Sequence, residues 1–301
     1  MVSDLLVGFY RVVHGRLHLR GAGWLLRRFA SILPGLQAYP FSLPEVGVAL
    51  LDFRDIGAYS MVNFFSLGEF GQNDNLFRWL EKALQPGDVF WDVGANVGMV
   101  SGHFAHPRFQ LSSLHAFEPN PDPLKTLQSL FSDNARCVVH PFGLGDEDQL
   151  ITMNLSSAGS VVGSIVQDFH EGKKIQIQVR RGDAALGELR LPVPQVIKID
   201  VEGFEPSVFA GLKETIARHH PILAFEHTHL SDEQIQKLVP RDYLLFFIQT
   251  DGSLNTDISM RHNSYDAIIV PAEKVGRVTL EATVPGRNRM ADATRRETRQ
   301  N

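Results

Sequence analysis

The sequence lacks most of the features of a secreted, membrane-spanning or nucleic-acid-binding protein. Its single cysteine, Cys137, excludes an internal disulfide and a cysteine-rich zinc site, and it fits a reducing compartment. No run reaches the roughly 18 apolar residues that would cross a bilayer, and the first residues lack the small-residue cleavage site of a signal peptide. Acids outnumber bases 34 to 29, whereas a nucleic-acid surface usually needs a basic excess. We therefore expect a cytoplasmic protein that does not bind nucleic acid.

Residues 4–33 predict one or two amphipathic helices, followed by a connector rich in Pro and Gly. Apolar residues recur at helical spacing along one face of the first helix: Leu5, Phe9, Val12, Val13 and Leu17. We expect this face to pack on the body of the protein. The segment also carries five arginines, so contact with a membrane surface is the alternative interpretation. Residues 1–44 are thus the predicted N-terminal helical extension.

From residue 76 onward, segments of strand and helix character alternate. The predicted strands are 89–93, 114–118, 137–140, 195–200, 221–226, 243–248 and 266–271. The predicted helices are 76–84, 97–106, 122–134, 205–219 and 231–239. Such alternation predicts an α/β fold with a doubly wound, Rossmann-like and mainly parallel sheet. The last two strands have no helix between them, so the last strand is expected to be antiparallel.

Two other segments depart from this alternation. Polar residues alternate with Ile and Val within 145–183, which predicts an inserted β-hairpin region. The segment 276–301 lacks apolar periodicity and is expected to be a disordered tail. One domain is therefore predicted over 45–275.

The stretch "PGDVFWDVGANVG" places an acid, Asp92, on a buried strand and follows it with Gly94 and Gly98. In a doubly wound sheet, ligands bind where the strands end. We expect Gly94 to permit the tight turn and Gly98 to let the next helix approach. Asn96 stands where a dinucleotide fingerprint has its second glycine, which argues against NAD. An acid would repel a phosphate but suits a cation. S-adenosylmethionine has a sulfonium and an ammonium and no phosphate, and is the predicted cofactor.

The next two strand ends fit the same ligand. Glu118 ends the strand 114–118, where an acid can accept both ribose hydroxyls. The backbone of Gly143 or Leu144 follows the third strand, where an adenine edge would lie. We therefore assign Glu118 and Gly143 to the cofactor site, together with Asp92, Gly94, Asn96 and Gly98 of the first turn.

Two further acids suggest where proton transfer takes place. Asp200 and Glu226 end the strands 195–200 and 221–226. If those strands are neighbours, about 4.8 Å apart, both carboxylates can face one pocket. They can act as acid and base, or they can hold Mg²⁺. Mg²⁺ is not favoured and no metal site is assigned, because no third oxygen ligand is evident. His227 is the alternative base, since its unperturbed pKa suits neutral pH.

From about residue 69 to 270 the chain resembles one known family, and four stretches within that range carry the resemblance. They are "FWDVGANVGMVS", "HAFEPNP", "FGLGDED" and "VIKIDVEGFEPSVFAGL". With these motifs the chain resembles FkbM-type S-adenosylmethionine-dependent methyltransferases. One departure is Gly182-Asp183, where the family usually has Leu-Asp, so the structural role of Asp183 is open.

The resemblance implies O-methylation of a natural product or glycan. It also implies that Glu69 reaches the methionine end of the cofactor, and that Ser164 hydrogen-bonds the cofactor or covers the pocket. We therefore expect a small-molecule or glycan acceptor, methylated on a hydroxyl of a sugar or sugar-bearing metabolite. Methylation of nitrogen or of a carboxyl group, and a non-catalytic binding protein on the same fold, stay open. The acceptor's identity and the oligomeric state are not predicted.

Overall fold

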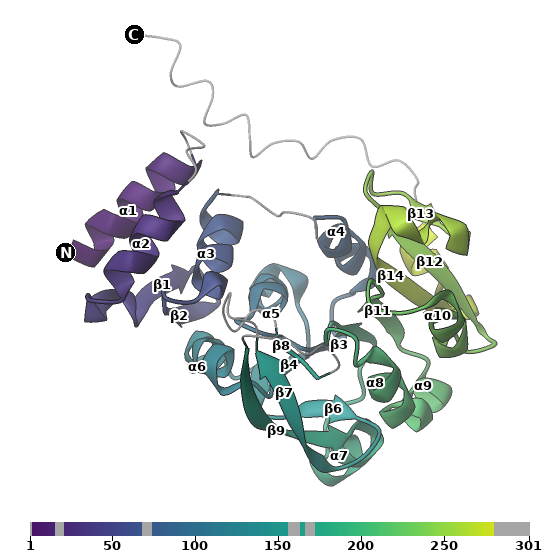
Figure 1. Ribbon diagram of the computed structural model, residues 1–301. Helices are drawn as coiled ribbons and strands as arrows, with labels where there is room; N and C mark the ends of the chain where they lie inside the picture. The colour runs from purple at the N-terminus through teal and green to yellow at the C-terminus, as the bar shows by residue number, and fades with distance from the viewer. Residues whose placement is uncertain (1, 16–20, 68–73, 156–162, 166–171, 280–301) are drawn as a thin grey trace.

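The computed structural model describes residues 2–15, 21–67, 74–155, 163–165 and 172–279, and in this part of the chain an eight-stranded sheet forms the centre (Figure 1). Its strand order is β13-β12-β14-β11-β10-β3-β4-β5. The strands are β3 (Val89–Val93), β4 (Ser113–Phe117), β5 (Cys137–His140), β10 (Val196–Ile199), β11 (Ile222–Glu226), β12 (Tyr243–Gln249), β13 (Leu254–Asn255) and β14 (Ser264–Pro271).

The predicted sheet is confirmed, including its antiparallel last strand. Strands β5, β4, β3, β10 and β11 are parallel neighbours, and β14 runs antiparallel between β11 and β12. Because β10 lies between β3 and β11, their carboxyl ends meet at one edge of the sheet. This is where a doubly wound sheet binds its ligands.

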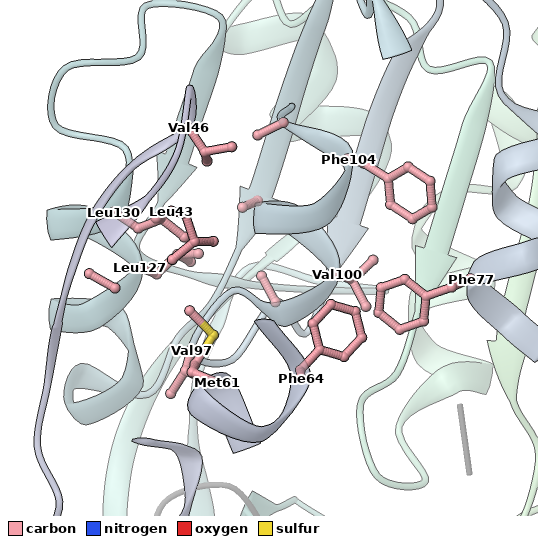
Figure 2. Packing of buried hydrophobic residues seen from close by; sticks show 14 of the residues in the cluster. Leu43, Val46, Met61, Phe64, Phe77, Val97, Val100, Phe104, Leu127 and Leu130 are labelled. Atoms are coloured by element: carbon pink, nitrogen blue, oxygen red, sulfur yellow. The ribbon is translucent and has the colours of Figure 1, made fainter. Parts of the chain in front are cut away.

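Helices cover both faces of the sheet because successive strand side chains point to opposite sides. Phe90 joins the apolar cluster on one side, and its neighbour Trp91 joins the cluster on the other. The first side is covered by α4 (Asp74–Ala83), α5 (Met99–Phe104) and α6 (Pro121–Leu130). The second is covered by α7 (Gly182–Glu188), α8 (Glu205–Gly211), α9 (Lys213–His219) and α10 (Asp232–Leu238). In Figure 2, Phe64, Phe77 and Phe104 gather near Val100 in the first cluster.

The predicted helix over 205–219 is two helices, α8 and α9, separated at Leu212. The break exposes the first N–H groups of α9, and Asp183 accepts hydrogen bonds from two of them, those of Glu214 and Thr215, both at 2.9 Å. A carboxylate at a helix N-terminus is stabilising. Asp183 therefore positions α9, which settles the structural role that the departure from the family pattern left open.

A second, smaller sheet forms the predicted hairpin insertion. Its order is β6-β9-β7-β8, with β7 and β9 antiparallel. The strands are β6 (Gly143–Gly145), β7 (Gln149–Leu155), β8 (Gly163–Ser164) and β9 (Lys173–Arg181). Met153, Ile177 and Val179 of this sheet pack against Phe204, which directly precedes α8. The insertion therefore stands beside the carboxyl end of β10.

The N-terminal segment forms two helices, α1 (Val2–Gly15) and α2 (Ala22–Ala30), as predicted. Most of the predicted buried face of α1 is exposed, although Val13 packs on the core and Leu17 lies outside the described residues. Val7 and Tyr10 of α1 are buried, whereas Leu5 is 70% and Phe9 53% exposed. The Tyr10 hydroxyl donates to Asn63 Oδ1 at 2.8 Å, which fixes this orientation. Because α1 carries apolar residues on both faces, their spacing alone did not identify the buried one.

The predicted domain boundary at 44 falls inside a hairpin of β1 (Tyr39–Leu43) and β2 (Gly47–Leu51). Strand β2 packs on α6, where the Thr126 hydroxyl donates to the Leu50 oxygen at 2.9 Å. Next come α3 (Ile56–Val62) and the π-helix η2 (Asn63–Leu67).

At the other end, the start of the expected tail forms α11 (Gly276–Thr279), and 280–301 lie outside the described residues. The short 3₁₀ helices are η1 (Pro34–Leu36), η4 (Pro107–Phe109), η5 (Ile258–Asn263) and η6 (Ala272–Lys274). Within the described ranges, no helix combines the length and the apolar character needed to cross a bilayer.

Candidate active site

A cavity of about 340 Å³ lies where β3, β4, β10 and β11 end. Six of the residues predicted to form the site line it: Gly94, Asn96, Glu118, Gly143, Asp200 and Glu226. Four others do not: Asp92, Gly98, Ser164 and His227. Glu69 lies outside the described residues. The structure therefore brings most of the predicted site together, and it gives the four other side chains different positions.

The two glycines after β3 are required for two different close contacts. Gly94 has φ 78°, and a Cβ there would lie 1.9 Å from the backbone oxygen of Asp200. Gly98 has φ 90°, and a Cβ there would lie 2.7 Å from Leu127 Cδ1. Gly94 thus lets the turn pass against the end of β10, and Gly98 lets α5 approach α6.

Asp92 is fully buried and pairs within the protein. Its Oδ2 accepts from the Ser101 hydroxyl at 2.5 Å, and its Oδ1 lies 3.3 Å from Lys198 Nζ. Lys198 Nζ is also 3.3 Å from Asp200 Oδ2 and donates to the Gly94 oxygen at 3.2 Å. Burial opposes the charge on Lys198, but Asp200 and Asp92 outweigh it and raise its pKa. This placement does not fit direct contact between Asp92 and a cationic ligand. Asp92 instead anchors Lys198, which holds Asp200 at the cavity.

Glu118 is buried at the cavity wall and accepts two backbone hydrogen bonds. Asn96 N–H donates to its Oε2 at 2.8 Å, and Asn120 N–H donates to its Oε1 at 2.7 Å. Asn96 has φ 51°, a left-handed conformation that Asn tolerates better than most residues. Burial raises the pKa of Glu118 to about 7, although the two backbone bonds oppose the rise. A carboxylate oxygen has more than one lone pair, so Glu118 can still accept from a ligand hydroxyl.

The other end of the cavity gathers carboxyl groups from three neighbouring strands. Asp200 follows β10, Glu226 ends β11, and Asp266 of β14 is the cross-strand partner of Glu226. Burial and then the nearby Asp200 raise the pKa of Glu226 to about 8 and that of Asp266 to about 7. Sequence reasoning missed Asp266; the signal was an acid at the start of the apolar run 267–270.

The loop after β10 adds Glu202 to this acidic end. Glu202 has φ 54°, an uncommon conformation for a residue other than glycine. The Ser164 hydroxyl donates to the backbone oxygen of Glu202 at 2.8 Å. The side chain of Glu202 places Oε2 3.2 Å from His229 Nε2. Ser164 therefore supports the loop that presents Glu202 to the cavity. The nearby Glu205 is buried and accepts from Val201 N–H at 3.0 Å, a structural role.

The assignment of His227 as alternative base does not fit its position. Its side chain is 2% exposed, and its Nε2 lies 3.2 Å from the Ser264 hydroxyl. Burial lowers its pKa to about 4. It packs edge-on against Phe247 in the core, away from the cavity wall. His229, two residues later, is the histidine that meets Glu202.

Comparison with known proteins identifies the family. The sequence model of the "Methyltransferase FkbM domain" matches residues 92–258. The hexuronic acid methyltransferase AglP of Haloferax volcanii is 26% identical over 199 residues, which cover 66% of this chain and 76% of that protein. The 31-O-demethyl-FK506 methyltransferase FkbM of Streptomyces tacrolimicus is 30% identical over 163 residues. That match covers 44% of this chain and 62% of the relative, less than two thirds of its length.

Among solved structures, a methyltransferase FkbM from Methylobacillus flagellatus is similar at a TM-score of 0.43 and 18% identity. The match covers 86% of this chain and 62% of that one, and at this score it adds nothing to the assignment. The sequence match from 92 to 258 alone spans more than half of the 301 residues. The chain therefore belongs to the FkbM family of S-adenosylmethionine-dependent methyltransferases.

Proposed function

We propose that the protein transfers the methyl group of S-adenosylmethionine to a hydroxyl of a sugar or sugar-bearing metabolite. The observation that carries this proposal is that one cavity is lined by Glu118 at one end and by Asp200 and Glu226 at the other. A methyltransferase needs residues that bind the cofactor on one side of the transferred methyl group and a proton acceptor on the other side. Glu118 is suited to the first role, and the acids at the opposite end of the cavity are suited to the second.

The spacing of the strands suits an extended cofactor. Glu118 follows β4 and Asp200 follows β10, with β3 between them. Two strand spacings separate these acids by about 10 Å. A nucleoside whose ribose hydroxyls bind Glu118 would lie across the turn at Gly94 and direct its other end toward Asp200. When bound there, S-adenosylmethionine supplies an electrophilic methyl group.

The two acids at the far end are suited to different roles. Because the pKa of Glu226 is raised to about 8, its carboxyl group is mostly protonated at neutral pH and can donate a hydrogen bond to the acceptor. Asp200 is held by Lys198 at 3.3 Å and can accept the proton of the acceptor hydroxyl. Two neighbouring carboxyl groups in different environments commonly serve one as the acid and the other as the base. Proton removal of this kind contributes roughly 10²–10⁴-fold to rate.

The acceptor class is supported by two observations. The relative from Haloferax volcanii is named for methylation of hexuronic acid, which is a sugar derivative. In this chain, Tyr265 lines the cavity beside Asp266 and is 39% exposed. Its ring and hydroxyl can together contact a sugar, since tyrosine presents an apolar body and a polar tip.

Thermal unfolding with each candidate ligand tests the proposal. A ligand at 100 times its dissociation constant should add about 2.7 kcal/mol of stability. We expect stabilisation by S-adenosylmethionine and by S-adenosylhomocysteine, and none by NADH. A gain of one methyl group in a panel of hydroxylated sugars, followed by mass spectrometry, would then identify the acceptor. Stabilisation by NADH alone would contradict the proposal.

A further inference from the structure

The acidic end of the cavity has the geometry of a cation site. Glu202, Glu226 and His229 each place one ligand atom so that the three atoms lie within 4.8 Å of one another. Two ligands on opposite sides of a divalent cation are about 4–5 Å apart, because each bond is about 2.0–2.6 Å long. The three atoms therefore need little movement to share one ion. Glu202 lies in the loop after β10, Glu226 is the last residue of β11, and His229 lies in the loop after β11, so their convergence is a property of the fold.

Charge at this end of the cavity also favours a cation. Asp266 is only 8% exposed, lines the cavity, and receives no hydrogen bond or ion pair at its carboxyl group from any described residue. It stands directly opposite Glu226 in the strand register. Two carboxyl groups this close resist ionising together, and a cation between them would favour the charged form of both. Lys198 lies between Asp92 and Asp200 and counteracts the effect on Asp266 only in part.

We propose that Glu202, Glu226 and His229 bind a divalent cation of the Mn²⁺ type at the acceptor end of the cavity. Once the ion displaces the proton of Glu226, two carboxylates and one imidazole form a mixed oxygen and nitrogen set, which suits such an ion. Three protein ligands leave coordination positions for the acceptor. The substrate class is then a sugar with two adjacent oxygen atoms, either a vicinal diol or a hydroxyl beside a carboxylate. This inference rests on the proposed function, which places the acceptor at this end.

In this arrangement the cation orients the hydroxyl and lowers its pKa. The proton passes to Asp200, which stands beside Glu226 at the cavity wall. Asp266 is not a ligand in this arrangement; its negative charge stabilises the ion from the neighbouring strand. Glu202 and His229 are thus the two ligands of the proposed set that the sequence did not reveal.

The test is titration of the chelator-treated full chain with Mn²⁺, followed by calorimetry and by electron paramagnetic resonance. We expect one site in the wild-type protein. Loss of a supporting contact alone costs about 10–100-fold in metal affinity, so Glu202→Gln and His229→Ala should each weaken binding by at least about tenfold. Glu233→Gln is the matched control: it removes an exposed carboxylate paired with Lys237 and should change nothing.

The affinity for S-adenosylhomocysteine, measured on the same samples, shows whether each variant still folds. It also distinguishes failure of the cation site from failure of the proposed function. We expect it to be unchanged in Glu202→Gln and in His229→Ala. If S-adenosylhomocysteine binds but Mn²⁺ does not, only the cation site is overturned. Equal weakening by Glu233→Gln, or full methyl transfer in excess chelator, would also overturn it. If S-adenosylhomocysteine does not bind the wild-type protein, the proposed function fails.

Discussion

Replacing Glu118 with glutamine tests the cofactor site with little change in shape. In the wild-type protein, the carboxylate accepts N–H groups from Asn96 and Asn120 at 2.8 and 2.7 Å. Glutamine keeps one acceptor oxygen but turns the other group into a donor. The substitution therefore removes the negative charge and one place at which a ribose hydroxyl can donate.

The expected loss follows from the value of a hydrogen bond to a charged group, about 1.5–3 kcal/mol. This corresponds to a roughly 10- to 150-fold higher Kd for S-adenosylhomocysteine in calorimetry. Turnover at saturating cofactor should change much less, because contacts to the ribose are present before and during methyl transfer. A Kd unchanged by Glu118→Gln would refute the assigned role.

The pH dependence gives a second, independent readout. Burial raises the pKa of Glu118 from 4.5 to about 7, so protonation sets in as pH falls through neutrality. The proposed contact needs the carboxylate, and wild-type affinity should therefore weaken between about pH 8 and about pH 6. Glu118→Gln cannot titrate and should show a nearly flat profile. An equally steep profile in the variant would assign the effect to another group.

Three further substitutions test the rest of the site. Asp200→Asn should bind S-adenosylhomocysteine normally yet lose about 10²–10⁴-fold in turnover if Asp200 is the base; full turnover would remove that role. Gly94→Ala combines φ 78° with a Cβ that would lie 1.9 Å from the Asp200 oxygen, so it should lower stability by more than about 2 kcal/mol in denaturant unfolding. A melting temperature equal to wild type would contradict this. Lys198→Met leaves the buried Asp92 carboxylate without its cation and should cost about 3–5 kcal/mol; unchanged unfolding would show that the pair is dispensable.

The order of elements and several residues of the cavity wall could be predicted because they depend on local signals. Strand–helix alternation defines a doubly wound sheet, and ligand residues follow the strand ends. Glu118, Asp200 and Glu226 were found in this way, each at the end of an apolar run. Gly94 was found because a turn this tight, against a neighbouring strand, admits only glycine.

The residues that were missed or misplaced depend on contacts between distant segments. Beyond the end of β11, alternation no longer determines which side chain faces the cavity, so the sequence could not separate His227 from His229. Asp266 belongs to an antiparallel strand whose register against β11 is set by the whole sheet. Asp92 was expected to face a ligand, yet it is covered by Lys198 from β10, which lies 106 residues further along the chain.

The proposed function depends on transfer of a methyl group from S-adenosylmethionine to an oxygen atom. The most direct measurement uses S-adenosylmethionine labelled with ¹³C in the transferred methyl group, a panel of sugar acceptors, and NMR of the products. We expect the label in a methyl ether on a sugar hydroxyl, formed about 10²–10⁴-fold more slowly by Asp200→Asn. Label on nitrogen, or in a carboxylate ester, would contradict it.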